Sequence, residues 1–220
     1  MVDIREAIRE RHSVRAFKDL PLEAEAVKEL EAEIKVCNGL SGLNIQLVTD
    51  EPEAFSAGKP GYGKFRNCRN YLALVGPGGK DVEIGYWGER IVLLAQCLGI
   101  NSCWVALTYK KGKAAVDIRP GEKLYMVIAL GYGETSGTEH RGKTAGDISN
   151  IDASSPDWFR EGVEAALLAP TAINQQKFRL ELKDGKVYAK AGFGPYSKVD
   201  LGIVKYHFEI GSGKDSSVWL

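Results

Sequence analysis

The sequence predicts a mixed fold of helices and strands, either α/β or α+β with a modest sheet. Segments with apolar residues at helical spacing are interspersed with short, β-branched apolar segments along the whole chain. Apolar residues make up 44% of the 220 residues and charged residues 26%, the balance of a soluble globular protein. This composition excludes a disordered chain and a coiled coil. Glycine occurs 25 times, so many turns or close backbone approaches are expected.

The first part of the chain carries clear helix and strand patterns. Val27, Leu30 and Ile34 recur at helical spacing, and the helix at 81–98 is apolar nearly all round, which is typical of a central helix. A loop rich in glycine is expected at 58–63. The predicted elements are helix 3–12, helix 22–36, strand 44–49, strand 71–75, helix 81–98, strand 103–107 and strand 124–130.

The remainder begins with a polar stretch over 131–156 that is rich in glycine and serine. A helix is predicted over 158–168, closed by Pro170. A hairpin follows, and its Lys-Asp-Gly turn at 183–185 is a typical two-strand connection. The predicted elements are helix 158–168, strand 178–182, strand 186–190 and helix 199–210, which Gly211 is expected to end.

Charge, cysteine usage and the chain start narrow the class of protein. Lys plus Arg equals Asp plus Glu at 29 each, so no overall field attracts nucleic acid or a membrane, and an anion site must come from local geometry. The charged start does not resemble a signal peptide. The uncharged run 91–109 is interrupted by polar residues and Gly99, which favours a buried helix followed by a strand over a membrane span. Four cysteines without C-x-x-C spacing indicate buried thiols. We therefore expect a soluble, cytoplasmic protein.

Two pairs of segments suggest an internal duplication. Leu40–Gln46 and Pro170–Gln176 each follow a helix, open a strand and carry a hydroxyl, an Asn and a Gln at matching places. The helix end Ile91–Gly99 has a counterpart 112 positions later in Ile203–Gly211. The alternative is that these are two unrelated helix–turn–strand units.

Two motifs stand out, and the first has side chains suited to binding a phosphate-bearing ligand. Arg11–Arg15 places three cationic or potentially cationic side chains around a hydroxyl, and Arg forks with a Ser hydroxyl match phosphate oxygens. Taken alone, this segment also fits a basic surface turn. Pro170–Gln176 alone also fits an ordinary helix end followed by a turn.

Together and in this order, the motifs resemble those of the FMN-dependent nitroreductase family. The shared patterns are R-x-S-x-R-x-F at Arg11–Phe17, G-[IL]-x-S-C-W at Gly99–Trp104, G-Y-G-E at Gly131–Glu134 before the basic pair Arg141 and Lys143, and A-P-[ST]-x-x-N-x-Q at Ala169–Gln176. The resemblance covers most of the chain. It implies an α+β, three-layer nitroreductase-like fold, with internally duplicated halves around a central helix and a mixed sheet.

One departure from the family pattern concerns the position of the second motif. In ordinary members the A-P-[ST]-x-x-N segment follows R-x-S-x-R within about fifty residues, and each flavin lies at a dimer interface. Here the early position holds the degraded Leu40–Asn44, and the intact version lies beyond residue 168. The resemblance is therefore to a fused pseudo-dimer. We expect a first half at 1–150 with the phosphate cluster, a second at 151–220 that completes one flavin site, and an empty second pseudo-site at Asn150–Ser155.

The resemblance also implies roles for individual residues. Arg11 and Ser13 would hold the FMN phosphate with Arg141 and Lys143, while Arg15 would lie at the N1–O2 edge of the ring, where a positive charge favours the reduced flavin. His12 would hydrogen-bond the ribityl chain or the pyrimidine edge through its backbone. The residues expected against the ring are Val105 and Ala106 on the inner face, and Pro170, Thr171, Ala172 and Asn174 on the opposite wall.

The implied activity is that of an FMN-dependent oxidoreductase. NAD(P)H would reduce the flavin, and a nitroaromatic, quinone or similar small-molecule oxidant would then reoxidise it. No side chain need act as an acid–base catalyst, and no metal site is expected. A monomer is favoured, with a further homodimer possible, and neither nucleic acid nor a membrane is expected as a partner. The alternative is a flavin-binding protein without turnover, for sensing or storage.

Overall fold

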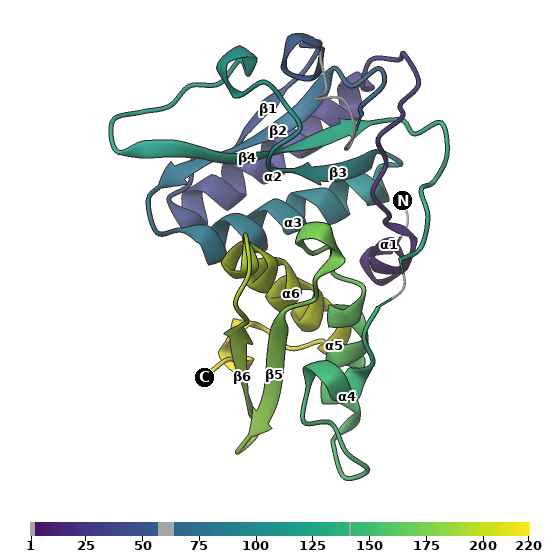
Figure 1. Cartoon of the computed structure of the whole chain (residues 1–220), viewed down its shortest axis with the longest axis vertical. Helices are drawn as coiled ribbons and strands as arrows, with labels where there is room; N and C mark the ends of the chain where they lie inside the picture. Colours follow the sequence, from purple (N-terminus) through teal and green to yellow (C-terminus); the bar gives the residue numbers. More distant parts are fainter. Residues whose placement is uncertain (1–2, 57–63, 141) are drawn as a thin grey trace. The chain divides into compact units, whose positions relative to one another are not determined.

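The structure, a computed structural model, describes residues 3–56, 64–140 and 142–220. The chain forms two compact units: unit 1 contains Glu10–Lys80 and Ile91–Thr138, and unit 2 contains Asp3–Arg9, Asp81–Arg90 and Glu139–Leu220. The glycine-rich loop predicted at 58–63 lies outside the described residues. The α+β class predicted from the sequence is confirmed, with helices, antiparallel strands and a separate hairpin (Figure 1).

The regular elements follow the predicted order. The helices are α1 (Ile4–Glu10), α2 (Ala24–Ser41), α3 (Asp81–Cys97), α4 (Ala145–Ile148), α5 (Asp157–Leu167) and α6 (Ser197–Ser212). The strands are β1 (Gln46–Val48), β2 (Asn70–Pro77), β3 (Asn101–Val105), β4 (Glu122–Gly131), β5 (Phe178–Lys183) and β6 (Lys186–Ala191). The short α4 was not predicted. It begins with a capping box in which Thr144 and Asp147 bond each other's backbone, a local signal that the sequence does contain.

The main sheet belongs to unit 1 and has the strand order β1-β2-β4-β3. All three neighbouring pairs are antiparallel, and parallel pairing occurs in isolated bridges such as Ser13 with Ser102. Both faces of β2 and β4 are buried: Tyr71 and Leu72 are both 0% exposed although they point to opposite faces. The sheet therefore forms the interior of this unit.

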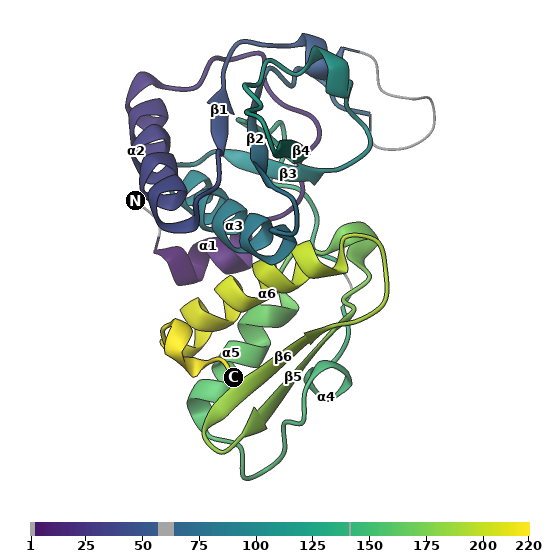
Figure 2. The ribbon, with the colours of Figure 1, turned by 90° about the vertical axis from the view of Figure 1, so that its left-hand side faces the viewer.

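Helix α2 lies beside the sheet of unit 1 (Figure 2). Of the predicted stripe it buries Leu30 and Ile34, whereas Val27 is half-buried; Ala26 and Cys37 are buried beside them. The predicted end at residue 36 was too early, because the helix continues to Ser41 and ends at Gly42, whose φ of 71° is left-handed. Asn38 stabilises this end by bonding the backbone of Ile45 with both its amide atoms.

Unit 2 contains the α5–α6 helix pair and the β5–β6 hairpin, which packs on α6 (Figures 1 and 2). The predicted hairpin turn is confirmed, because Asp184 and Gly185 both have positive φ, 47° and 74°. The aromatic rings of Phe159 and Phe208 lie 5.9 Å apart between the two helices. These contacts bury the apolar stripe of α5.

Within unit 2, the first part of α3 crosses α6 at two glycines. A Cβ added at Gly85 would lie 1.9 Å from the carbonyl oxygen of Val199, and one at Gly202 would lie 1.9 Å from that of Val82. The contact is reciprocal, since each glycine meets the residue three positions before the other. The two glycines lie 117 residues apart, whereas the helix ends had suggested a repeat offset of 112, so this contact does not follow the expected repeat.

The predicted helix stop at Gly211 was wrong. Helix α6 continues to Ser212, and Gly213, with a φ of 66°, is the left-handed residue at its end. Gly211 is needed for another reason, because a Cβ there would lie 2.4 Å from the Cβ of Ala165 on α5. By contrast, Gly99 after α3 has a φ of 77° and is the stop that the sequence predicted.

The central character of α3 is also confirmed, since every residue from Asp81 to Cys97 is buried or half-buried. Its Glu89 is 0% exposed and contacts His207 of α6, with Oε1 and Nε2 2.8 Å apart. Cys37, Cys68 and Cys103 are buried free thiols as expected, and Cys97 is half-buried. Among the helices that the structure describes, none combines the length and hydropathy that crossing a membrane requires.

Candidate functional site

Main-chain hydrogen bonds fix the course of the basic segment 11–18 in unit 1. On one side Val14 donates its N–H to Ser102 at the start of β3, at 3.0 Å. Further along, Lys18 donates to Tyr132 at 2.8 Å, and Glu134 donates to Ala16 at 3.0 Å. The segment is thus an extended run paired with the end of the sheet, not the loose basic turn that remained an alternative.

The extended conformation separates the side chains of this segment into two sets. Val14 and Phe17 are 3% and 0% exposed and enter the core, while Ser13 and Arg15 are exposed. Arg11, at the start, is only 3% exposed. A buried guanidinium next to an exposed hydroxyl and an exposed guanidinium provides charged and hydroxyl donors for an anionic ligand.

The pKa of the Cys103 thiol, on β3, is affected by charged and polar side chains of this segment. Burial raises the pKa of Cys103, while the charge of Arg15, a hydrogen bond with Ser13 and the charge of Arg11 oppose the increase. The two arginines and the serine are therefore close enough to Cys103 on β3 to affect its thiol. Val105 ends that strand at 3% exposed, and Ala106 follows it, so the predicted residues of unit 1 all lie along segment 11–15 and the end of β3.

Gly137 also determines the course of this segment, although no motif in the sequence indicates it. Its φ is +84°, and an added Cβ would lie 2.7 Å from the Cβ of His12. We expect Gly137→Ala to displace His12 and Ser13, because both the left-handed backbone and the contact oppose a side chain. The stability should fall by about 1–3 kcal/mol. Thermal unfolding of this variant beside Gly112→Ala, a glycine with open space around it, would measure the effect. Equal melting temperatures of the two variants would contradict a close approach of Gly137 to His12.

In unit 2, Gln176 links the predicted wall segment 170–176 to Lys143. Its backbone N–H donates to the hydroxyl of Thr171 at 3.0 Å, and its side-chain Oε1 accepts from the backbone of Lys143 at 2.6 Å. The Lys143 ammonium donates to the carbonyl of Gln176 at 2.8 Å. Lys143, predicted as a phosphate ligand, is therefore also a structural partner of the wall. Arg141 lies outside the described residues.

The wall segment itself adopts an unusual backbone conformation. Ile173, Asn174 and Gln176 all have positive φ, at 49°, 54° and 42°. The side chains of Ile173 and Asn174 are exposed, whereas Gln176 is 2% exposed. The segment thus presents Asn174 and its neighbours to the surface of unit 2. The sequence identified these residues, but not the conformation that exposes them.

The second-half counterpart of the basic segment, Asn150–Ser155, has its donors already engaged. The hydroxyl of Ser154 donates to the carboxylate of Asp152 at 2.7 Å, and these hydrogen bonds lower the pKa of Asp152. Arg160 reaches the segment from α5, but its Nε donates to the carbonyl of Ser155. In the described part of this segment, the side chains of Ser154 and Ser155 thus bond the carboxylate of Asp152.

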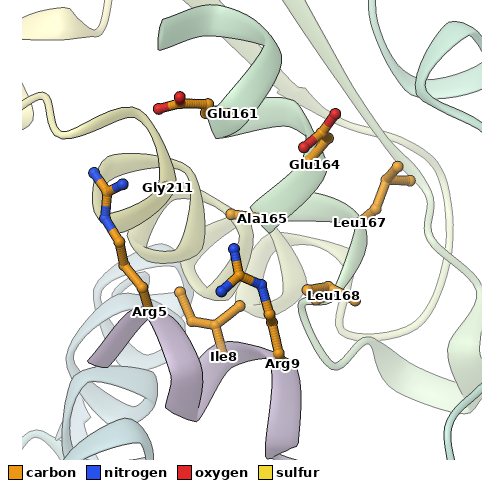
Figure 3. Close-up of a pocket in the computed structure, with 9 residues that line it drawn as sticks. All are labelled: Arg5, Ile8, Arg9, Glu161, Glu164, Ala165, Leu167, Leu168 and Gly211. Atoms are coloured by element: carbon orange, nitrogen blue, oxygen red, sulfur yellow. The ribbon is translucent and has the colours of Figure 1, made fainter. Parts of the chain in front are cut away.

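A separate cavity of about 520 Å³ lies in unit 2 between α1 and α5. Figure 3 shows Arg5 and Arg9 on one side and Glu161 and Glu164 on the other, all four of them exposed. Because the charges are balanced, this cavity offers no net positive charge to a phosphate. Among the described residues, none of the predicted site residues lines it, so the cavity is distinct from both predicted segments.

The α+β fold and the two segments define a class of protein, and comparison with known proteins identifies it. The model of the family described as "Putative TM nitroreductase" matches residues 3–212. The chain therefore belongs to this nitroreductase family. Comparison with curated protein sequences gives no match.

Solved structures confirm the nitroreductase fold. A nitroreductase from Thermotoga maritima aligns with a TM-score of 0.69 and 22% identity, over 96% of this chain and 83% of its own. A nitroreductase in complex with FMN from Desulfovibrio desulfuricans aligns with a TM-score of 0.53 and 19% identity, over 71% of this chain and 99% of its own. An NADH dehydrogenase/NAD(P)H nitroreductase from Parabacteroides distasonis aligns with a TM-score of 0.52 and 18% identity, over 70% and 99%.

Proposed function

We propose that the protein is an FMN-dependent oxidoreductase of nitroreductase type, which uses NAD(P)H to reduce a nitroaromatic, quinone or similar small molecule. The observation that carries the proposal is the basic segment 11–15, held by main-chain bonds so that Ser13 and Arg15 are exposed beside the buried Arg11. Membership of the nitroreductase family, and the FMN in the D. desulfuricans structure, support it.

The donor set of the described residues fits a flavin mononucleotide. Guanidinium groups bind phosphate oxygens through paired N–H donors, and a hydroxyl adds a further donor, as in Arg11 and Ser13. Val105 ends β3 in the apolar core, and the half-buried Ala106 that follows it offers an apolar contact for a ring. When bound, FMN would supply hydride chemistry between the nicotinamide and the oxidant.

The chain's own residues would bind and orient the cofactor. We propose that Arg11 and Ser13 hold the phosphate, with Arg141 and Lys143, and that Arg15 places a positive charge at the N1–O2 edge of the ring. His12 would contact the ribityl chain or the pyrimidine edge through its backbone. The wall would come from Pro170, Thr171, Ala172 and Asn174, with Val105 and Ala106 on the inner face.

The first test is spectroscopic. The purified protein is expected to be yellow, to release FMN on denaturation and to lose its flavin absorbance when NADH or NADPH is added. Colourless protein that does not bind added FMN would overturn the proposal. Bound FMN that neither nicotinamide reduces would favour the alternative, a flavin-binding protein without turnover.

We further propose one flavin per chain, on a monomer whose two motif segments both contact it. Arg15→Ala, Arg11→Ala and Asn174→Ala should each weaken FMN binding by about 10- to 100-fold, because each removes a polar contact to the ligand. Fluorescence titration would measure this, with Arg179→Ala as the control, because this half-buried arginine pairs with Glu181 on the hairpin and belongs to neither motif. Arg15 is exposed, so its variant should fold even where Arg11→Ala does not. Two flavins per chain would contradict a single site to which both segments contribute. Unchanged FMN binding by Arg15→Ala and Asn174→Ala would contradict it as well.

A further inference from the structure

The wall segment 170–176 is held in a conformation that its sequence does not favour. Left-handed φ values suit glycine, yet here Ile173, Asn174 and Gln176 adopt them. Ile173 is β-branched, which makes this conformation especially unfavourable for it. Strained backbone of this kind persists only where surrounding contacts hold it. The contacts that hold this segment are therefore part of any site to which it contributes.

Besides the bonds of Gln176, the segment is held by the carboxylate of Asp200, in the first turn of α6. Its Oδ1 accepts the backbone N–H of Ala172 at 2.9 Å, and its Oδ2 accepts the side-chain Nε2 of Gln175 at 2.7 Å. The same Nε2 donates to the carbonyl of Pro195 at 2.8 Å. Asp200 is 3% exposed and 28 residues away from Ala172 in the chain. One buried carboxylate thus connects the wall segment, the loop before α6 and α6 itself.

Burial raises the pKa of Asp200 to about 6, against the opposing hydrogen bonds from Gln175 and Ala172. Charged groups on the neighbouring elements do not contribute to this change in pKa. These groups are Asp81 and Glu83 on α3, Lys143 and Lys177 beside the wall segment, and Lys198 on α6. Tyr196, just before α6, does not contribute either. The carboxylate therefore changes charge within the range of mildly acidic solutions.

We propose that Asp200 is a positioning residue whose ionised carboxylate holds Ala172 and Gln175, and with them the flavin wall, in the binding conformation. This inference rests on the proposed function. Protonation removes the negative charge that both donors face, so the tether weakens as the pH falls through about 6. FMN retention is then expected to decrease in mildly acidic solution, while the rest of the fold persists.

As the pH falls, the free energy of unfolding and the affinity for FMN are expected to change in opposite directions. A folded-state pKa raised above the ordinary value means that the ionised form is disfavoured in the folded protein. The contribution of Asp200 to the unfolding free energy therefore increases as the pH falls toward the ordinary pKa of an aspartate. Asp200→Asn, which is uncharged at every pH, should be at least as stable as the wild type at neutral pH and yet bind FMN less well.

The test compares FMN dissociation constants of the wild type and Asp200→Asn at about pH 7.5 and about pH 5. Since the phosphate of FMN also titrates near pH 6, the ratio of the two constants is the informative quantity. The variant should bind on the order of tenfold more weakly at the higher pH and about equally at the lower one. Asp157→Asn, an exposed acid in the first turn of α5, is the matched control and should bind like the wild type.

A second readout does not depend on the cofactor. In the flavin-free protein, the backbone amide resonance of Ala172 should titrate with a midpoint near pH 6 and should not titrate in Asp200→Asn. A ratio of dissociation constants that does not change with pH, or an Ala172 amide that does not titrate, would overturn the role of Asp200. Absence of FMN binding at every pH would instead overturn the proposed function.

Discussion

Gly202→Ala is expected to destabilise the protein by about 3 kcal/mol or more, enough to reduce sharply the yield of folded protein. The added methyl group would lie 1.9 Å from the carbonyl oxygen of Val82 and 2.6 Å from the backbone N of Tyr86. Both atoms belong to the backbone of α3, so no side-chain rotation can relieve the overlap. The helices would have to separate, and their packing would be lost. Urea denaturation monitored by circular dichroism would measure the change.

The matched control is Gly39→Ala, also a helical glycine. No heavy atom outside its own neighbourhood lies within 4 Å of the Cβ that would be added. Alanine favours a helix over glycine by about 1 kcal/mol, so this variant should be slightly more stable than the wild type. If both variants lost stability equally, the loss would reflect general sensitivity of the helices and not the close crossing.

His207→Leu is the second substitution with a large expected effect, about 3–5 kcal/mol. Nδ1 of His207 lies 3.1 Å from the carbonyl oxygen of Ala165, which can only accept, so this nitrogen carries a proton. The other ring nitrogen lies 2.8 Å from the carboxylate of Glu89, and both side chains are 0% exposed. Removing the ring leaves a buried carboxyl group without its imidazole partner.

A double substitution separates this pair from simple packing. His207→Leu with Glu89→Leu removes both polar groups, and an apolar replacement of a buried pair is often neutral. The double variant should therefore be more stable than His207→Leu alone, as measured by unfolding midpoints. If Glu89→Leu instead destabilises the His207→Leu background, the pair does not account for the loss.

Much of the fold could be predicted from local pattern. Helical spacing located α2, α3, α5 and α6, and the turn residues located the β5–β6 hairpin. The wall segment 170–176 and the basic segment 11–15 were recognised because their chemistry resides in neighbouring residues. Such features need no knowledge of what packs on them.

The rest depends on contacts between residues that are distant in the chain. Gly211 has the appearance of a helix stop, and only the approach of Ala165 shows why it is a glycine inside a helix. Asp200 resembles an ordinary acid in a first helical turn, and its burial against Ala172 gives it a different role. The left-handed conformation of Ile173 opposes its own preference, so no propensity could have predicted it.

The main-chain pairing of segment 11–18 has a consequence for protein engineering. Backbone bonds to Ser102 and Tyr132 determine its course, and two apolar anchors, Val14 and Phe17, fill the core. The outward positions, Ser13 and Arg15, contribute little to that course. Their charge and size are therefore open to redesign, and a library varied at these two sites could be selected for binding a chosen anionic ligand on an unchanged scaffold.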